Sequence, residues 1–214
     1  MSNVVVVDYG MGNLLSVCRA LEHLGAQVEL TSNPETVRNA ERIVLPGVGA
    51  FGDGMQALEE QQLGRAIQDA ADDGTPLLGI CLGAQMLLDS SEEFGNHLGL
   101  GLIPGKVLAI PPCGIAGETL KIPHMGWANL RPANDHLFDN PLLDHTAPDS
   151  AVYFVHSFQA HPQDPADIAA VCDYAGNQLT AMVRHGNVFG CQFHPEKSGP
   201  VGLNILKRFL EIAA

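Results

Sequence analysis

Short apolar runs alternate with longer amphipathic stretches through the first ninety residues of the chain. The apolar runs are rich in β-branched residues and predict strands at 4–8, 27–31, 42–46 and 76–80. The stretches between them predict helices at 13–24, 34–40, 53–73 and 83–90. Because these strands are apolar on both faces, the pattern is typical of βαβ units around a buried parallel sheet.

The second half of the chain has a different texture. Residues 98–150 are rich in proline and glycine, which predicts irregular or antiparallel structure at one edge. Four closely spaced strands are then expected at 152–158, 168–174, 179–185 and 187–193, with a turn at 184–187. Ser198 as cap and Pro200 in the first turn predict a last helix from residue 199. Without a repeat or linker, we expect one α/β domain over 1–214.

Composition and charge narrow the classes of function. Of 214 residues, 46% are hydrophobic, with 23 glycines and 14 prolines, which is an ordinary globular mixture. Eleven Lys and Arg residues oppose 24 Asp and Glu residues, and a net charge of −13 argues against nucleic acid or anionic lipid as partner.

Membrane and export signals are not expected. The longest apolar run, 77–88, is interrupted and shorter than the roughly 20 residues that span a bilayer. The first residues lack the basic segment of a secretory signal, so we expect a cytoplasmic location.

The strongest chemical signal is the segment GICLG at 79–83, between an apolar strand and a predicted helix. Glycines on both sides of Cys81 allow a tight turn that exposes a nucleophile at a helix N-terminus, where the thiolate is favoured. The N–H of Leu82 would then point to a developing oxyanion. The alternative is a buried core cysteine. The five cysteines are an odd number without a CxxC pair, so neither a disulfide framework nor a metal site is expected.

The segment CQFHPE at 191–196 supplies a candidate base and its orienting acid. His194 and Glu196 are two residues apart and can converge, although such a pair is a weak signal by itself. Together with Cys81 they predict a thiol triad. The order Cys, His, Glu differs from the nucleophile, acid, histidine order of α/β-hydrolases.

Two glycine loops have alternative interpretations. The segment GVGAFG at 47–52 fits a dinucleotide fingerprint, but it follows the third strand, and its glycines suit peptide N–H groups that face an oxyanion. The segment DYGMGN at 8–13 predicts a tight first βα turn, and its function is left open.

Several segments together resemble a known family. GICLGAQ, PGVGAFG and QFHPEKSG resemble the class I, triad-type glutamine amidotransferases. DYGMGNLLSV at 8–17, PHMGW at 123–127 and HPEKSG at 194–199 are more narrowly similar to the glutaminase subunit of imidazole glycerol phosphate synthase. The resemblance runs nearly end to end, with departures at Ala128 and Cys191.

The resemblance implies a fold, an activity and a partner. The fold is the flavodoxin-like three-layer sandwich of class I glutamine amidotransferases, an α/β fold with a mostly parallel central sheet and a small antiparallel edge region. The activity is hydrolysis of glutamine to glutamate and ammonia, without a cofactor. The ammonia would pass to a separate (β/α)₈ barrel cyclase that makes imidazole glycerol phosphate and aminoimidazole carboxamide ribotide in histidine biosynthesis.

The resemblance also implies residue roles. The oxyanion would be held by Leu82 and by the loop that contains Val48 and Gly49. The glutamine site would be formed by Gly49, Gln85, Glu93, Ser157 and Phe158. The partner interface would contain Trp127 and Lys197, unless Trp127 is a core residue and Lys197 only solvated. Glu93 has a solvated helix-end acid as its alternative, and structural hydrogen bonding is expected of His124 and His156.

Two other functions are weighed against this one. A different glutaminase, such as the anthranilate or aminodeoxychorismate synthase component, should lack PHMGW. A non-catalytic regulatory subunit should not need the complete set of Cys81, His194 and Glu196.

Overall fold

The computed structural model describes residues 2–133, 138 and 140–213. Its first half runs β1 (Asn3–Val7), α1 (Leu14–His23), β2 (Gln27–Thr31), α2 (Pro34–Arg38), β3 (Ile43–Gly47), α3 (Phe51–Glu60), α4 (Leu63–Asp72), β4 (Leu77–Cys81) and α5 (Leu82–Met86). Strands dominate the second half: β5 (Leu88–Ser91), β6 (His97–Leu98), β7 (Ile103–Ala109), β8 (His124–Asn129), β9 (Arg131–Pro132), β10 (Ala151–His156), β11 (Phe158–Pro162), β12 (Ile168–Tyr174), β13 (Asn177–His185) and β14 (Val188–Cys191). Three 3₁₀ helices, η1 (Pro141–Leu143), η2 (Pro165–Asp167) and η3 (Pro195–Lys197), and the last helix, α6 (Gly199–Glu211), complete the described elements.

The central sheet has the order β2-β1-β3-β4-β14-β13-β12-β9. Strands from β2 to β14 pair in parallel, and β13, β12 and β9 continue the sheet in antiparallel pairing. Two smaller sheets lie beside it, β10-β8 and β11-β7-β5-β6. The predicted parallel sheet with an antiparallel edge region is confirmed.

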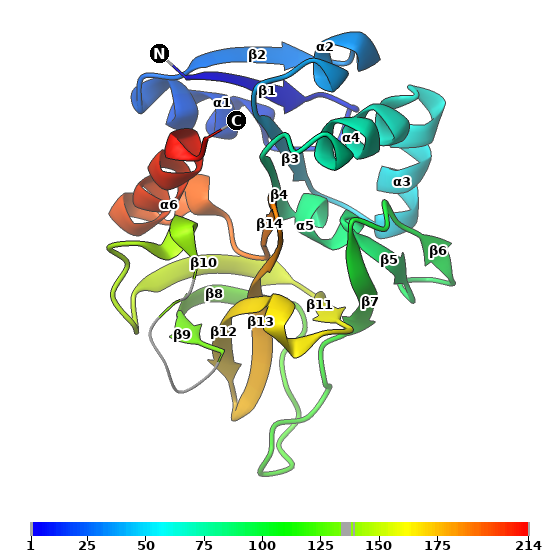
Figure 1. Cartoon of the computed structure of the whole chain (residues 1–214). Coiled ribbons are helices and arrows are strands. Elements are labelled where there is room, and N and C mark those ends of the chain that lie inside the picture. Colours follow the sequence, from blue (N-terminus) through cyan, green and yellow to red (C-terminus); the bar gives the residue numbers. More distant parts are fainter. Residues whose placement is uncertain (1, 134–137, 139, 214) are drawn as a thin grey trace.

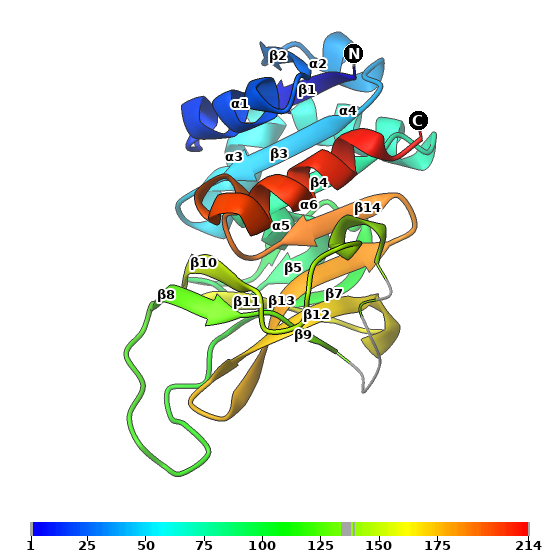
Figure 2. The same ribbon diagram turned by 90° about the vertical axis from the view of Figure 1, so that its left-hand side faces the viewer.

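Helices cover both faces of the parallel strands (Figures 1 and 2). Alternate residues of β1 point to opposite sides: Val4 and Val6 pack in one apolar cluster with α1 and α6, and Val5 and Val7 pack in a second cluster with α2 to α5. The apolar run is thus buried twice, as expected of a strand in a covered parallel sheet.

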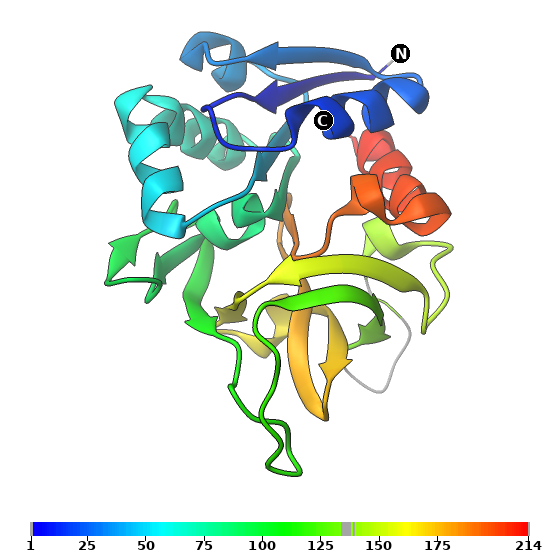
Figure 3. The ribbon, with the colours of Figure 1, turned by 180° about the vertical axis from the view of Figure 1, so that it is seen from behind.

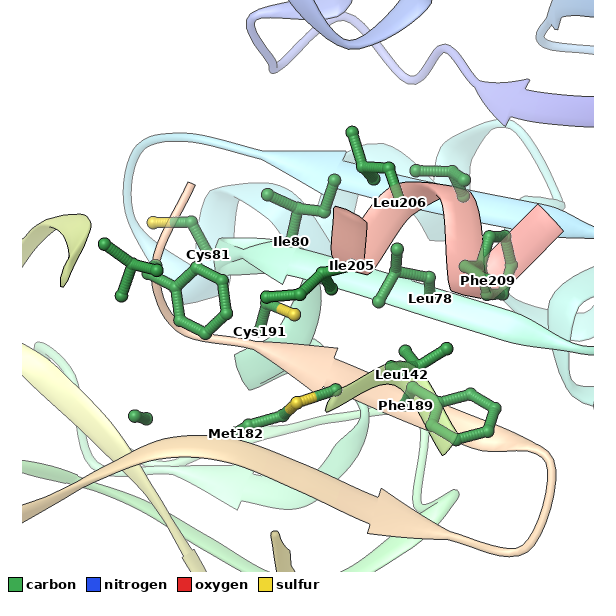
Figure 4. Close-up of a cluster of buried hydrophobic side chains, with 14 of the residues drawn as sticks. Leu78, Ile80, Cys81, Leu142, Met182, Phe189, Cys191, Ile205, Leu206 and Phe209 are labelled. Atoms are coloured by element: carbon green, nitrogen blue, oxygen red, sulfur yellow. The ribbon is translucent and has the colours of Figure 1, made fainter. Parts of the chain in front are cut away.

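The cluster below α6 leads directly to the end of β4. In Figure 4, Leu78 and Ile80 of β4 face Ile205 and Leu206 of α6, and Cys81 lies at the end of the strand. All four aliphatic side chains are at most 1% exposed, so β4 and its terminal cysteine are held in place by a closely packed apolar core.

Two of the expected helices are wrong in extent. The predicted helix 53–73 is two helices, because Gln62 adopts the left-handed conformation with φ 60° between α3 and α4. The predicted helix 83–90 ends at Met86, because Leu88 begins a strand and pairs in parallel with Ile103. Tertiary strand pairing overrides local helix propensity there.

Two further expectations, the strand over 152–158 and the helix cap at Ser198, are wrong. The strand expected over 152–158 is interrupted at Ser157, between β10 and β11. Ser198 precedes α6 but does not cap it, since its hydroxyl donates to the His194 carbonyl at 2.6 Å and accepts from the Tyr153 N–H at 3.0 Å. The hydroxyl therefore links the triad segment to β10.

Within the described part of the chain, no helix is both long and apolar enough to cross a membrane.

Candidate active site

Cys81 lies at the junction between β4 and α5. Its backbone has φ 54° and ψ −109°, a strained conformation for a residue other than glycine. Gly47, the last residue of β3, lies opposite Cys81 in parallel register, so the loop after β3 begins beside the thiol. The side chain is 8% exposed. The predicted tight turn at 79–83 is present.

The neighbouring glycines are required by close backbone packing. A Cβ at Gly79 would lie 2.7 Å from Cα of Ala84, and a Cβ at Gly83 would collide with the Leu45 carbonyl oxygen. Larger residues would push α5 away from β3 and β4. The pattern GxCxG is therefore explained by packing of the turn as well as by exposure of the nucleophile.

His194 and Glu196 lie together beyond the end of β14. Strand β14 pairs in parallel with β4, with Cys191 opposite Ile80, so the chain after Cys191 runs beside Cys81. The His194 Nδ1 atom lies 2.9 Å from Glu196 Oε1, and the two side chains are 3% and 1% exposed. The predicted convergence of this pair is observed.

The protonation of His194 depends on both neighbours. Burial favours the neutral ring, but interactions with Cys81 and Glu196 outweigh it and raise the pKa of His194 to about 9. Its Nε2 atom is buried and has no hydrogen-bond partner among the described residues, so it is available to a reacting group.

The candidate oxyanion groups lie on two segments that meet at Cys81. Leu82 is the first residue of α5. Val48 and Gly49 follow β3, and Gly49 has φ 111°, which is open to glycine. The Tyr9 hydroxyl donates to the Pro46 carbonyl at 2.9 Å, and a Cβ at Gly49 would lie 2.7 Å from Met11. The loop at 8–13 thus packs against the loop at 46–49.

Gln85 is hydrogen-bonded to Phe158, and the neighbouring Ser157 is hydrogen-bonded to Ile110. The Gln85 Nε2 group donates to the Phe158 carbonyl at 2.9 Å, and the Ser157 carbonyl accepts from the Ile110 N–H at 2.9 Å. Both carbonyls are therefore engaged within the protein. The side chain of Gln85 is buried, on the short helix α5 that begins directly after Cys81.

Glu93 lies after β5 and reaches the start of α3. Its Oε2 atom accepts from the Phe51 N–H at 2.6 Å, which satisfies one of the free amides of the helix end. The side chain is half-buried. It is thus a helix-capping acid next to the loop after β3, which differs from the simple solvated acid of the alternative interpretation.

His124 and His156 form a buried pair between β8 and β10. Their Nδ1 and Nε2 atoms lie 3.1 Å apart, and the His156 Nδ1 atom lies 2.9 Å from the Phe158 carbonyl. Burial lowers the pKa of both rings, to about 4 for His156. The expected structural hydrogen bonding is present.

Sequence reasoning missed Gln192 as a member of the site. It is 3% exposed, and its Nε2 group donates to Cys81 Sγ at 3.9 Å and its Oε1 accepts from Gln85 Nε2 at 3.0 Å. The Val155 carbonyl also lies 3.8 Å from Cys81 Sγ. The one indication in the sequence was that Gln192 is a polar residue in the otherwise apolar segment VFGCQF, directly before HPE.

Trp127 and Lys197 are both exposed. Trp127 is 59% exposed on β8, which pairs with β10 (Figure 3), and it meets Tyr153 edge-on. Met125 is 61% exposed two residues earlier on β8. Lys197 lies on η3, and its side chain has no ion pair within residues 2–133, 138 and 140–213. Trp127 is therefore not a core residue.

A dinucleotide fingerprint is followed about twenty residues later by an acid that binds the ribose, and the acids at that distance from GVGAFG are Asp69, Asp72 and Asp73. Asp69 is paired with Arg65 at 2.8 Å and with Arg38 at 3.3 Å on the outer helices. In the part of the chain that the structure describes, no group of three His, Cys, Asp or Glu residues could hold a metal ion.

Comparison with known proteins decides the family. A family model described as glutamine amidotransferase class-I matches residues 5–213. The imidazole glycerol phosphate synthase subunit HisH 1 of Legionella pneumophila is 48% identical over 99% of this chain and 100% of its own length. The HisH subunit of Methylococcus capsulatus is 49% identical over 98% of this chain and 96% of its own length. The chain belongs to the HisH family of class I glutamine amidotransferases.

Solved structures agree with the fold of this HisH-family chain. A chain of the Thermotoga maritima PurLQS structure superposes with a TM-score of 0.75 at 23% identity and covers 99% of both chains. A structure described as a glutamine amidotransferase gives a TM-score of 0.71 at 17% identity, with 97% of this chain and 99% of that chain covered. At these identities the likeness concerns the fold alone.

Proposed function

We propose that this HisH-family protein hydrolyses glutamine to glutamate and ammonia through Cys81, His194 and Glu196. The observation that carries the proposal is the strained cysteine at the β4–α5 junction beside a buried His–Glu pair. A regulatory subunit without catalysis would have no need for the strain at Cys81 or for a buried imidazole with a free Nε2.

The chemistry follows from these positions. The Cys81 thiolate attacks the side-chain amide carbon of glutamine, and the oxyanion accepts hydrogen bonds from the Leu82 N–H and from a peptide N–H at 47–49, near Val48 and Gly49. The C–N bond then breaks, and His194 gives its proton to the leaving ammonia. Water, deprotonated by His194, hydrolyses the thioester to glutamate and frees the thiol. Glu196 holds the imidazole tautomer throughout.

The glutamine backbone is held by a second group of residues. We assign this role to Gly49, Gln85, Glu93, Ser157 and Phe158. Because the carbonyls of Ser157 and Phe158 are already engaged, these two residues offer peptide N–H groups to the substrate. Glu93 is the acid among them and suits the α-ammonium group.

The partner is a separate cyclase of (β/α)₈ barrel architecture, which receives the ammonia and makes imidazole glycerol phosphate and aminoimidazole carboxamide ribotide. Support comes from the names of the HisH relatives, which are subunits of imidazole glycerol phosphate synthase. Trp127 would contact the cyclase, since exposed aromatic side chains are typical of interfaces. The resemblance to the family assigns Lys197 to the same interface, and its side chain is exposed. The whole chain acts as one glutaminase domain in the cytoplasm. Relatives at this identity favour this pairing over anthranilate or aminodeoxychorismate synthase.

A substitution of the nucleophile tests the proposal. We expect Cys81→Ala, in complex with the cyclase, to abolish glutamine-dependent synthesis and to retain synthesis from added ammonium, because ammonia supply and cyclisation are separate steps. Cys18→Ala, on α1, is the matched control and should keep both activities. Glutamine-dependent activity of Cys81→Ala above a few per cent of the unmodified complex would remove Cys81 as the nucleophile.

A further inference from the structure

Gln192 is a buried amide that lies beside the candidate nucleophile. It follows Cys191, the last residue of β14, which is opposite Ile80 in the parallel pairing with β4. Its position next to Cys81 is therefore fixed by the sheet and not by a flexible loop. The Nε2 group donates to Cys81 Sγ at 3.9 Å.

The orientation of this amide is determined by its other partner. Gln85 Nε2 is a donor only, so the atom of Gln192 that faces it at 3.0 Å must be the oxygen. The nitrogen of Gln192 then has to face the sulfur. Gln85 is itself oriented by the Phe158 carbonyl, which is an acceptor only.

The chain of hydrogen bonds continues to β8 with a single possible direction. The Phe158 carbonyl also accepts from His156 Nδ1 at 2.9 Å, so the neutral ring carries its proton on Nδ1. Its Nε2 atom is then an acceptor, and His124 must donate from Nδ1 at 3.1 Å. Every bond from His124 to Cys81 therefore has a defined donor, and β8 is the strand that exposes Trp127.

We propose that Gln192 is a positioning residue that holds the Cys81 sulfur by an N–H donor, and that the chain through Gln85, His156 and His124 keeps this donor aimed at the sulfur. This inference rests on the proposed role of Cys81 as the nucleophile. A donor stabilises a thiolate more than a thiol, since hydrogen bonds to charged groups are the stronger ones. Gln192 thus raises the thiolate population and restrains its direction of attack.

Other groups also act on the sulfur and have to be kept constant. Tyr9, His156 and His194 interact electrostatically with Cys81 or with one another, and Glu196 is bound to His194. A substitution at Gln192 leaves all of these titratable groups in place. Any change in the titration of the thiol then reports the loss of the amide donor.

The test is the pH dependence of Cys81 alkylation by iodoacetamide, followed by peptide mapping in the full-length chain. Gln192→Met removes the donor at similar length. We expect the midpoint of alkylation to rise by about one pH unit and the rate at neutral pH to fall about tenfold. With the cyclase present, kcat for glutamine should fall about tenfold while KM changes less than about twofold. Gln178→Met, at an exposed position of β13, is the matched control and should change neither value.

The outcomes separate this inference from the proposed function. An unchanged alkylation midpoint in folded Gln192→Met, or an equal shift in Gln178→Met, would overturn the role of Gln192. Should Gln192→Met fail to fold, Gln85→Met frees the same amide to rotate and should produce the same upward shift; an unchanged midpoint there also overturns it. Alkylation requires neither glutamine nor cyclase, so this result is independent of whether the chain is a glutaminase.

Discussion

Each residue of the triad depends on a different part of the fold. Cys81 is held by the strained junction of β4 and α5, and His194 and Glu196 by the segment beyond β14. Because β4 and β14 are neighbours in parallel, their carboxyl ends bring the thiol and the imidazole to the same edge of the sheet. The parallel pairing of β4 with β14 thus brings together residues that are more than a hundred positions apart in the sequence.

The pKa of His194 reports directly on its interactions with Cys81 and Glu196. Its pKa of about 9 exceeds the ordinary value, so the native state binds a proton more tightly than the unfolded state. The resulting stabilisation is fully present below about pH 6.5 and is lost as the pH rises through about 9. We expect Cys81→Ala to lower the pKa of His194, measured by NMR titration of the ring, because the cysteine contributes to the raised value.

Cys18→Ala is the control for this titration, since Cys18 is a half-buried cysteine of α1 that is not among the groups that shift the pKa of His194. It should leave the pKa of His194 unchanged. A pKa of His194 that stays near 9 without Cys81 would mean that Glu196 alone sets the protonation, and the thiol would then lack its imidazolium partner.

Local motifs explain which site residues could be predicted. Cys81, His194 and Glu196 lie in short segments whose residue types carry the chemistry, so the sequence was sufficient to find them. Gln192 could not be assigned, because its role depends on contacts with Cys81 and Gln85, each more than a hundred residues away in the chain. The cap from Glu93 to Phe51 is another contact between distant segments.

At the scale of elements, the alternation of strands and helices was predictable and the breaks were not. The parallel strands β1, β3 and β4 form from apolar runs that any covered sheet requires. The break at Gln62 lies in a polar segment without Gly or Pro, and β5 lies in a segment with helical character. Both are decided by packing and pairing with distant elements, for which the local pattern contains no signal.

The close packing at the junction of β4 and α5 predicts that a larger residue at Gly83 lowers the stability of the fold. Gly83→Ala places a Cβ against the Leu45 carbonyl, which cannot move without disturbing β3. We expect a loss of about 3 kcal/mol in the free energy of unfolding, measured by urea denaturation. Gly64→Ala, also in the first turn of a helix, should change stability by less than about 1 kcal/mol, because its Cβ meets Leu100 at an ordinary 3.5 Å. Equal effects of the two substitutions would contradict the close approach of α5 to β3.

At the scale of the whole molecule, the parallel strands that carry the candidate triad and the exposed strands that could bind a partner are different parts of the fold. The helical layers cover the parallel strands, and the paired strands β8 and β10 lie at the other end of the molecule (Figure 3). Trp127 and Met125 of β8 are exposed, and Tyr153 of β10 meets Trp127 edge-on. The Cys81 sulfur touches the Val155 carbonyl of β10, so this exposed pair of strands also borders the nucleophile. A partner that binds there is therefore close to the site of ammonia release.

Dependence on the partner is expected from this proximity. The glycines of the loop after β3 allow a peptide at 47–49 to rotate at little cost, and one oxyanion donor is worth roughly 10²–10³ in rate. We expect weak glutamine hydrolysis by the isolated chain, strong stimulation by cyclase with its ribotide ligand, and a reduction of that stimulation by about tenfold in Lys197→Ala, with little change in glutamine binding. Stimulation is measured as ammonia released per minute.

Lys207→Ala is the matched control, because Lys207 is an exposed lysine on α6. It should keep full stimulation. Complete glutaminase activity in the purified chain alone would end the idea of partner dependence, and equal losses in the two lysine variants would assign Lys197 no specific part in docking.

The covalent intermediate is the most direct test of the central claim that Cys81 is the nucleophile of a glutaminase. The chain in complex with the cyclase is mixed with glutamine, quenched in acid during turnover, digested and analysed by mass spectrometry. We predict one glutamyl thioester on the peptide that contains Cys81 and none on the peptides that contain Cys18 or Cys113. Ammonia release without an adduct on Cys81, or with the adduct on another cysteine, would contradict the account.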